Sequence, residues 1–408
     1  MPTIDTKCIC CGETGEKPAS VFRDVKLGKD GIHDIEIHVG FCEVCGNFSR
    51  FNLPNKAEHV QLHQSVYHYL HEASLSYADA EISDYIDQIT SLMNLKKGTI
   101  LEIGCGRGQI IKGFARRGFT CIANEASGYG DLENSFAGEN IQIHSGMIED
   151  LMLEPASMDL ILAKAVLEHL TDISSFFEHA RKALKPGGYL NIACIPAVFK
   201  ESFEEDHLHL NDVLGGGLIS MLHTWIPTPL SARQLGKRFG FEVVWEDTKH
   251  PISGRLNLLF KKGTTNGKPG AIKPSEYQTV CGLFEKYHQF EHRSLQTIAD
   301  YLTRWKRNRV WCYGVGSLCV SLLKRLNEFG FVFEGLLDSN PEKQGLEIDG
   351  IKIERPEEAD IRSTDKVLIT VLLPVVEKEI EAGLRSRFEF DGGQISTLSW
   401  FLRRQAQN

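Results

Sequence analysis

The pattern of apolar and polar positions predicts a strand, a glycine-rich turn and a helix between residues 98 and 118. A short apolar run, Ile100 to Ile103, meets three alternate glycines at positions 104, 106 and 108. Beyond them, apolar residues recur at helical spacing at Ile110, Ile111, Phe114 and Ala115. Glycine tolerates positive φ and lets a ligand approach the backbone, so this turn can seat a ligand over the carboxyl end of the strand.

Similar apolar runs predict further strands and helices on both sides of this unit. We expect strands within 120–125, 158–163 and 184–190, and late antiparallel strands at 241–244 and 256–260. Helical spacing covers most of 58–95 and 277–306, and turn-forming residues at 263–274 predict a linker. A second strand and turn at 310–317 then precede a helix and a strand that ends at Asp338. Alternating strands and helices predict an α/β protein.

Length and composition narrow the class of protein. At 408 residues the chain is too long for one ordinary core, so we expect two or three domains. Hydrophobic residues make up 42% and charged residues 24%, as in a globular protein. A net charge of -9 gives no electrostatic reason to expect a nucleic-acid partner. Apolar runs end well short of the ~20 residues that span a bilayer, and the amino terminus lacks signal-peptide features. We therefore expect a cytoplasmic protein with no membrane partner.

Cysteines gather near the amino terminus in a metal-binding pattern. Five of the 11 lie in the first 45 residues, and four form the pairs Cys8/Cys11 and Cys42/Cys45, each followed by glycine. Two such units present four thiolates, which complete a tetrahedral Zn²⁺ site and leave no open position, so we expect structural zinc. The 30 residues between the pairs require a hairpin insertion, and Cys10 fits neither unit. A redox pair is the alternative, but no βαβ pattern surrounds either unit.

The glycine turn resembles motif I of the class I S-adenosylmethionine-dependent methyltransferases. The sequence is Glu102-x-Gly104-x-Gly106-x-Gly, with a carboxylate two residues before the first glycine, whereas a dinucleotide fingerprint would run Gly-x-Gly-x-x-Gly. Glu125 ends the next strand, about 20 residues on, where carboxylates bind ribose hydroxyls in doubly wound nucleotide sites. The alternative is an α/β domain with incidental glycines. The resemblance implies donor contacts from Glu102, Gly104, Cys105, Gly106, Glu125, Met147, Ile148 and Lys164.

The flanking segments resemble those of the zinc-containing sugar C-methyltransferases. Tyr67-His68-Tyr69-Leu70, with serines at 74 and 76, is similar to the family's lid over the methyl donor, although His71 and Glu72 replace its paired serines. Residues 338–345 are similar to the family's carboxy-terminal domain. The resemblance implies a zinc-binding domain at 1–57, a methyltransferase domain at 58–264 and a Rossmann-like, substrate-supporting domain at 265–408. It also implies a sugar-nucleotide acceptor, and we expect a monomer.

The carboxy-terminal unit has part of the spacing of a second nucleotide site. Asp338 lies 22 residues after Gly316, as an acid would in such a site, but Cys319 takes the place of the third glycine. About 100 residues also cannot hold both halves of a dinucleotide fold. We therefore expect no second cofactor there.

Histidines are the candidates for the general base that a carbon acceptor would require. His169 follows the strand at 158–163, at the sheet edge where ligands bind. By count back from Gly240, His223 falls on the second histidine of the family's Tyr-His-Glu-His motif, and it is the favoured base. Met221 and Leu222 replace the first histidine and the glutamate. His207 and His209 are further candidates. O- or N-methyl transfer, or donor binding without catalysis, remains the alternative function.

Overall fold

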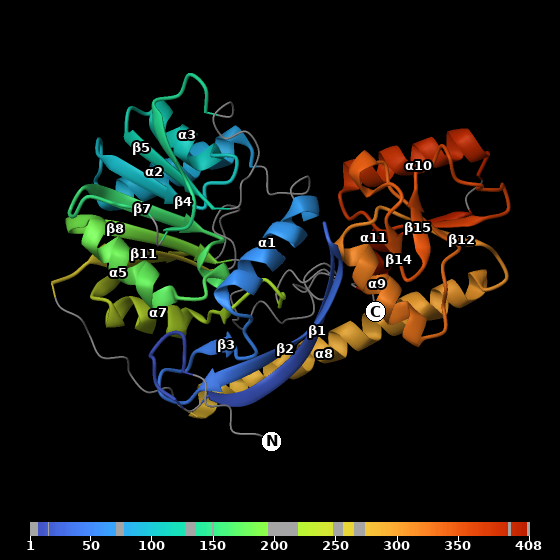
Figure 1. The fold of residues 1–408 in the computed structure, drawn as a ribbon, viewed down its shortest axis with the longest axis horizontal. Coiled ribbons are helices and arrows are strands. Elements are labelled where there is room, and N and C mark those ends of the chain that lie inside the picture. The colour runs from blue at the N-terminus through green and yellow to red at the C-terminus, as the bar shows by residue number, and fades with distance from the viewer. Residues whose placement is uncertain are drawn as a thin grey trace.

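Three β-sheets organise the chain in the computed structural model (Figure 1). The structure describes residues 7–14, 16–70, 77–126, 136–148, 151–194, 219–247, 256–264, 274–390 and 393–405. The α/β class predicted from the sequence is confirmed, with two mostly parallel sheets and one antiparallel sheet.

The amino-terminal sheet is built on the hairpin that the cysteine spacing required. Strands β1 (Glu16–Gly28) and β2 (Gly31–Cys42) pair along their whole length, from Glu16 opposite Cys42 to Gly28 opposite Gly31. The sheet order is β1-β2-β3-β9, in which β3 is Phe48–Arg50 and β9 is Trp225–Ile226. The last strand therefore comes from the middle of the chain, a pairing that the sequence did not indicate.

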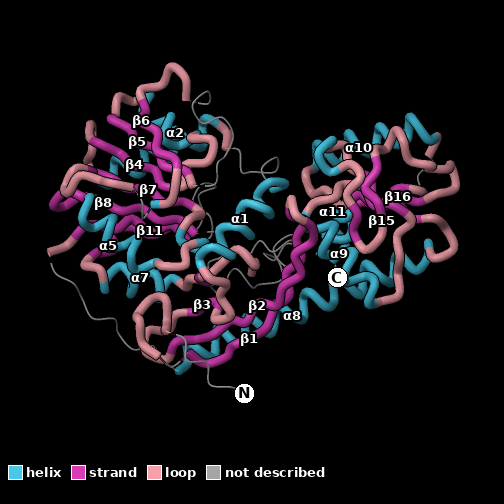
Figure 2. Tube along the Cα trace, in the orientation of Figure 1, coloured by secondary structure: helices cyan, strands magenta, loops and turns pink. Residues whose placement is uncertain are grey.

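The hairpin links the two ends of the molecule. Helix α8 (Pro274–Leu302) runs beside it (Figures 1 and 2), and Phe22 packs edge-on against Phe284 at 5.3 Å between ring centroids. Near the hairpin tip, Val25 and Leu27 are buried in the core of the carboxy-terminal unit. The β1–β2 hairpin is thus a shared structural element rather than part of the cysteine-rich end alone.

The central sheet has the order β10-β11-β8-β7-β4-β5-β6. Strands β4 to β8 run parallel where they pair, and β10 and β11 add an antiparallel edge, as the sequence predicted. The strands, in chain order, are β4 Thr99–Ile103, β5 Thr120–Glu125, β6 Ile141–Ser145, β7 Met158–Lys164, β8 Leu184–Cys194, β10 Phe241–Asp247 and β11 Leu256–Lys262.

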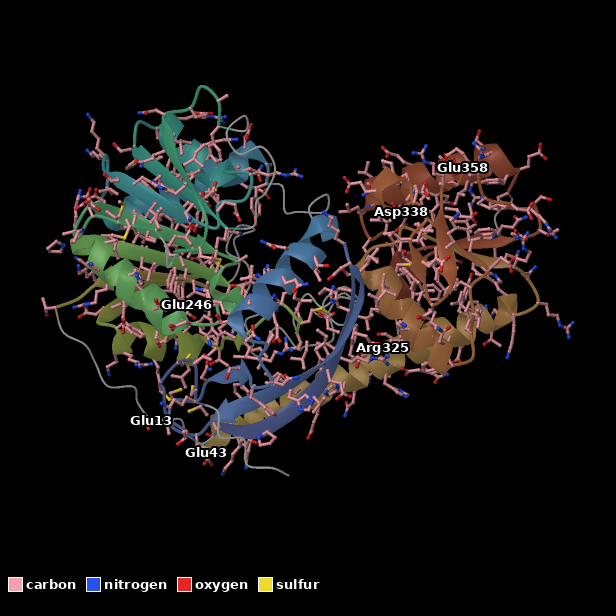
Figure 3. All side chains as sticks on the ribbon, in the orientation of Figure 1. Glu13, Glu43, Glu246, Arg325, Asp338 and Glu358 are labelled. Atoms are coloured by element: carbon pink, nitrogen blue, oxygen red, sulfur yellow. The ribbon has the colours of Figure 1, made fainter. Side chains whose placement is uncertain are left out.

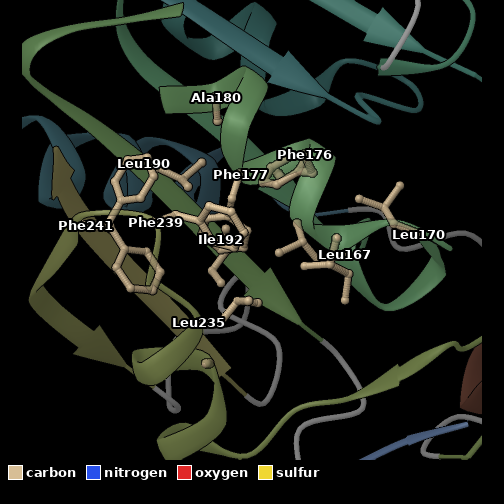
Figure 4. Packing of buried hydrophobic residues seen from close by; sticks show 14 of the residues in the cluster. Leu167, Leu170, Phe176, Phe177, Ala180, Leu190, Ile192, Leu235, Phe239 and Phe241 are labelled. Atoms are coloured by element: carbon tan, nitrogen blue, oxygen red, sulfur yellow. The ribbon is translucent and has the colours of Figure 1, made fainter. Parts of the chain in front are cut away.

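Helices cover both faces of the central sheet. They are α2 Asp79–Met93 and α3 Gln109–Arg116 on one face, and α5 Ile173–Ala183 and α7 Pro229–Arg238 on the other. Figure 4 shows the second face, where Phe177 of α5 stacks on Phe239 at 5.3 Å and lies against Phe241. Burial on two faces explains why the parallel strands read as continuous apolar runs.

The carboxy-terminal sheet has the order β14-β15-β13-β12-β16-β17. Its strands are β12 Val310–Tyr313, β13 Gly335–Leu337, β14 Glu347–Ile348, β15 Ile351–Glu354, β16 Lys366–Ile369 and β17 Ile395–Thr397. Its helices are α9 Ser317–Glu328, α10 Pro374–Phe388 and α11 Leu398–Gln405, with the short turns η7 Thr303–Trp305 and η8 Pro341–Lys343. Within the described ranges, no helix combines the length and apolar character needed to cross a membrane.

Candidate functional site

The turn after β4 has the conformation that its glycines predict. Gly104, Gly106 and Gly108 have φ of +65°, +53° and +70°. A Cβ on Gly104 would lie 2.5 Å from the Val166 side chain, and one on Gly108 would lie 2.1 Å from Phe136. A Cβ on Gly106 would meet nothing within 4 Å, so the backbone at Gly106 borders open space in the described structure. The turn therefore fits a ligand that approaches at Gly106.

Glu102 anchors the helix that follows this turn. Its side chain is 3% exposed, and Oε2 accepts a hydrogen bond of 2.9 Å from the backbone N–H of Ile111 in the first turn of α3. Burial raises the pKa of the Glu102 carboxyl to about 8, while this hydrogen bond and the nearby Lys164 act in the opposite direction. The contact explains why a carboxylate stands two residues before the glycines, and it gives Glu102 a structural role beside the predicted donor contact.

Glu125 connects the end of β5 to the glycine turn. Its Oε2 accepts a hydrogen bond of 2.8 Å from the backbone N–H of Gly106, and the residue is 6% exposed. The backbone N–H of Cys105 donates to the Asn124 carbonyl at 3.0 Å, so the turn is held to β5 at two adjacent points. A carboxylate at this strand end fits the ribose role predicted for Glu125.

The other predicted donor contacts lie at the same edge of the sheet. Met147 is partly exposed and Ile148 is buried directly after β6, next in the sheet to β5. Cys105 is buried within the turn. Tyr67 lies in helix α1 (Lys56–Leu70), but its side chain is outside the described residues, so its predicted lid role stays a prediction.

Lys164, at the end of β7, forms an unexpected pair with Tyr77. Its Nζ donates to the Tyr77 hydroxyl at 2.5 Å and lies 4.4 Å from the centroid of the ring. Burial lowers the pKa of Lys164 to about 8, although Glu102 and Glu168 act in the opposite direction. Tyr77 is only partly buried, whereas Tyr85, on α2, is buried and has its hydroxyl bonded to Asn191.

His169 and His223 lie side by side, and two further histidines join them. The His169 ring centroid is 5.0 Å from that of His223 and 4.7 Å from that of His63. His59, one turn before His63 on α1, lies 5.2 Å from the His63 ring. Burial lowers the pKa of His169 to about 4 and also lowers the pKa values of His59 and His63, so these three imidazoles are neutral near pH 7. His207 and His209 lie outside the described residues.

Met221 and Leu222 are packing residues where the family motif has a histidine and a glutamate. They are 0% and 2% exposed and belong to the apolar cluster beneath the amino-terminal sheet. The backbone of this segment is held by Asp24, whose Oδ2 accepts from the Met221 N–H at 2.7 Å, and by Arg50, which donates to the Met221 carbonyl at 2.7 Å. These two side chains therefore supply no acid or base.

The four predicted zinc ligands converge. The sulfur atoms of Cys8, Cys11, Cys42 and Cys45 all lie within 4.8 Å of one another, with 3.6 Å from Cys8 to Cys45 and 3.5 Å from Cys11 to Cys42. Zn–S bonds of about 2.3 Å in a tetrahedron place sulfurs about 3.8 Å apart, so the donor set fits zinc. In Figure 3, Glu13 and Glu43 are labelled at this end of the molecule.

Cys10 lies beside the cysteine cluster but outside it. Its side chain is 3% exposed, and its backbone N–H donates to the Cys8 sulfur at 3.4 Å. Amide hydrogen bonds of this kind stabilise a metal-bound thiolate, so Cys10 contributes through its backbone rather than its own sulfur.

Asp338 in the carboxy-terminal unit is committed to internal bonds. Its Oδ2 accepts from the Val315 N–H at 2.8 Å and from Lys343 Nζ at 3.1 Å, and Oδ1 accepts from the Asn340 N–H at 2.9 Å. The residue is labelled in Figure 3 and is 7% exposed. These bonds give the acid three internal donors, and the expectation of no second cofactor stays a prediction.

Comparison with known proteins assigns a domain to the central sheet. Residues 101–192, which include most of β4, the glycine turn, β5 and β7, match the family model described as a methyltransferase domain. The ubiquinone biosynthesis O-methyltransferases of Chelativorans sp. (strain BNC1) and Bartonella tribocorum are 33% identical over 105 residues and 32% identical over 114 residues. These alignments cover 25% and 27% of this chain and 42% and 46% of those proteins, so the chain spans less than half the length of these curated relatives.

Two solved structures are similar at lower identity. The Burkholderia thailandensis 1,6-didemethyltoxoflavin-N1-methyltransferase, with bound 1,6-didemethyltoxoflavin and S-adenosylhomocysteine, is 14% identical, with 56% of this chain and 96% of that chain covered and a TM-score of 0.41. A putative methyltransferase in complex with the Haloferax volcanii Trm112 activator is also 14% identical, with coverage of 47% and 100% and a TM-score of 0.35. Both TM-scores lie below 0.5, so these likenesses add no functional detail.

Proposed function

We propose that the chain is an S-adenosylmethionine-dependent methyltransferase that acts on a small polar acceptor. The observation that carries the proposal is the arrangement around Gly106, inside the segment that matches a methyltransferase domain. A Cβ on Gly106 would meet nothing within 4 Å, Glu102 accepts a hydrogen bond from the helix after the turn, and Glu125 accepts one from the Gly106 N–H. The bound donor supplies an activated methyl group, so the protein's task is orientation. Glu125 and the turn would hold the nucleoside part, and Lys164 with Tyr77 would border the reacting end.

The first candidate acceptor is a carbon of a sugar nucleotide. It is supported by the resemblance of the cysteine units and the flanking segments to the sugar C-methyltransferases. A carbon acceptor needs a base, and His169 and His223 lie together after β7 and before β9. The four cysteines would hold structural zinc, because their sulfurs surround one point and leave no open ligand position.

The second candidate is transfer to an oxygen or nitrogen. It is supported by the names of the two curated relatives and by Met221 and Leu222, which take two positions of the carbon-methylating motif. A heteroatom nucleophile needs less help from a base than a carbon acid does.

The test has two stages. Calorimetry with S-adenosylhomocysteine asks whether the donor site binds, and the absence of binding would refute the proposal. Incubation with methyl-labelled S-adenosylmethionine and sugar nucleotides, or with a small-molecule extract, then asks whether label is transferred. Binding without transfer to any fraction would favour a donor-binding protein without catalysis.

A further inference from the structure

Helix α1 brings two histidines to different parts of His169. His63 Nε2 lies 3.1 Å from His169 Nδ1, so it contacts the ring. His59 Nε2 lies 2.8 Å from the backbone carbonyl of His169, so it contacts only the main chain. The two are one helical turn apart on α1 and more than 100 residues from His169 in sequence.

A third contact fixes the tautomer of His169. Its Nδ1 also lies 3.1 Å from the carbonyl oxygen of Leu222. A carbonyl oxygen only accepts, so Nδ1 must carry the proton, and the lone pair of the neutral ring is on Nε2. The same Nδ1–H then faces His63 Nε2, which must be the acceptor nitrogen of a His63 ring protonated at Nδ1. The Leu222 carbonyl oxygen and His63 Nε2 are therefore both acceptors for the His169 Nδ1–H.

A metal site does not account for the histidines. Among the described residues, only the four cysteines bring three or more ligand atoms within 4.8 Å of one another. His169 Nδ1, the ring nitrogen that faces His63, is already bonded to the Leu222 carbonyl and so cannot join His63 in binding one ion. A proton-conducting role fits the atoms better than a metal-binding role does.

We propose that His63 is a positioning residue that completes a two-histidine proton relay with His169. The inference rests on the proposed function and on His169 acting as its base. The bond between the acceptor atom and hydrogen breaks, the proton goes to His169 Nε2, and the electron pair left on the acceptor forms the bond to the methyl carbon. The bond from that carbon to the donor sulfur breaks at the same time, and its electron pair stays on the sulfur of the departing S-adenosylhomocysteine. The Nδ1 proton of His169 passes to His63 Nε2, and its electron pair stays on Nδ1. His63, which is partly exposed, releases its Nδ1 proton to water. The starting tautomers return when His169 Nε2 loses its proton to water, His63 Nε2 passes a proton back to His169 Nδ1, and His63 Nδ1 takes a proton from water.

The relay answers a physical difficulty of this site. The His169 ring lies beside those of His63 and His223 and is only partly exposed, so an imidazolium held there loses part of its hydration. Passing a proton on to His63, which is also partly exposed, gives that charge a second route to water before the next turnover. His59 cannot take this role, because its contact is with a backbone oxygen.

The variants His63→Gln and His59→Gln form a matched pair. Gln at 59 can still donate to the His169 carbonyl, whereas Gln at 63 can fill space but cannot accept and release a proton. We expect His63→Gln to lower the single-turnover rate of methyl transfer about 10- to 100-fold, within the range of general acid–base effects, and His59→Gln to stay within about threefold. Affinity for S-adenosylhomocysteine should not change in either variant. Free imidazole should restore activity to His63→Ala.

A second measurement needs no acceptor. In protein with ¹⁵N-labelled histidine, we expect the His169 spectrum of the Nδ1–H tautomer and a scalar coupling across the hydrogen bond to His63 Nε2. An Nε2–H tautomer for His169, an unchanged rate in His63→Gln, or equal losses in both variants without rescue by imidazole would each overturn the relay. Failure of the wild type to transfer methyl, with the expected tautomer and coupling present, would instead overturn the proposed function.

Discussion

The Glu125 carboxylate and the Gly106 backbone N–H form a 2.8 Å hydrogen bond that ties the end of β5 to the turn after β4. The carboxy-terminal unit repeats this relationship, because Asp338 after β13 accepts from the Val315 N–H after β12 at the same distance. Asp338 also pairs with Lys343 at 3.1 Å, and of the two acids only Glu125 lies in the segment that matches a methyltransferase domain. The family match, rather than the hydrogen bond that both acids make, favours donor binding at the central sheet.

The first prediction concerns Glu125 and the donor. Glu125→Ala removes both the proposed ribose acceptor and the Gly106 hydrogen bond, and leaving polar groups unpaired costs about 1 to 3 kcal/mol. We expect affinity for S-adenosylhomocysteine to fall about 10- to 100-fold in calorimetry. Glu139→Ala, which removes a partly exposed carboxylate paired with Arg116, should bind like the wild type. Unchanged affinity in Glu125→Ala would contradict the assignment.

The second prediction concerns zinc. Cys42→Ser removes one of four converging thiolates, so bound metal should be lost and the amino-terminal sheet should become easier to unfold. Cys10→Ser changes a buried sulfur but keeps the backbone N–H that contacts Cys8, so it should retain one metal ion per chain. Metal content by mass spectrometry, with protease sensitivity as the folding readout, tests both. Loss of metal in Cys10→Ser alone would show that the ligand set is wrong.

The local features of this chain could be predicted because their causes are local. Gly104, Gly106 and Gly108 specify a turn through positive φ, and Cys-x-x-Cys spacing specifies two thiolates on one knuckle. The 30 residues between the cysteine pairs predicted a hairpin, because the chain must turn back on itself for both pairs to reach one ion. Strands β1 and β2 form that hairpin. The predicted domain boundaries stay predictions.

The long-range features could not be predicted because no local pattern encodes them. Trp225–Ile226 is too short to show a strand period, yet it pairs with β3. Tyr77 and Lys164 are 87 residues apart, and although the resemblance implies a donor contact from Lys164, no local pattern pairs it with Tyr77. His59 and His63 have visible helical spacing, but only the packing of α1 against η3 (Leu167–His169) brings them to His169.

The third prediction concerns pH and Glu102. Its folded pKa, about 8, lies above its ordinary value of 4.5, so its contribution to stability is fully present below 4.5 and is lost as pH rises toward 8. Glu102→Gln mimics the protonated form and keeps an acceptor for the Ile111 N–H. The free energy of unfolding of the wild type minus that of Glu102→Gln should therefore fall by about 1.4 kcal/mol per pH unit across this window.

Urea unfolding at several pH values tests this sign. The histidines act oppositely, since a lowered pKa at His169 makes stability rise with pH between about 4 and 6.5. They are present in both proteins, so their effect cancels in the difference. A difference that is flat from pH 5 to 8 would mean that Glu102 titrates normally and is not desolvated.

The last prediction decides which histidine is the base. The count from Gly240 favours His223, whereas the Leu222 carbonyl gives His169 the Nδ1–H tautomer, with the lone pair on Nε2. With His169 as the base, His169→Ala should lower the single-turnover rate of methyl transfer by about 10²- to 10⁴-fold. His223→Ala, which removes a neighbour 5.0 Å away, should cost much less. Both variants should be compared at equal saturation with the donor, because the pocket is shared. The reverse ranking would make His223 the base and would overturn the relay through His63.

Wild-type rates in both variants would point instead to a heteroatom acceptor or to His207 or His209 as the base. A pH profile of the transfer rate separates these two outcomes. An ascending limb near the histidine pKa of ~6.5 indicates a substitute histidine, and a flat profile indicates the heteroatom acceptor.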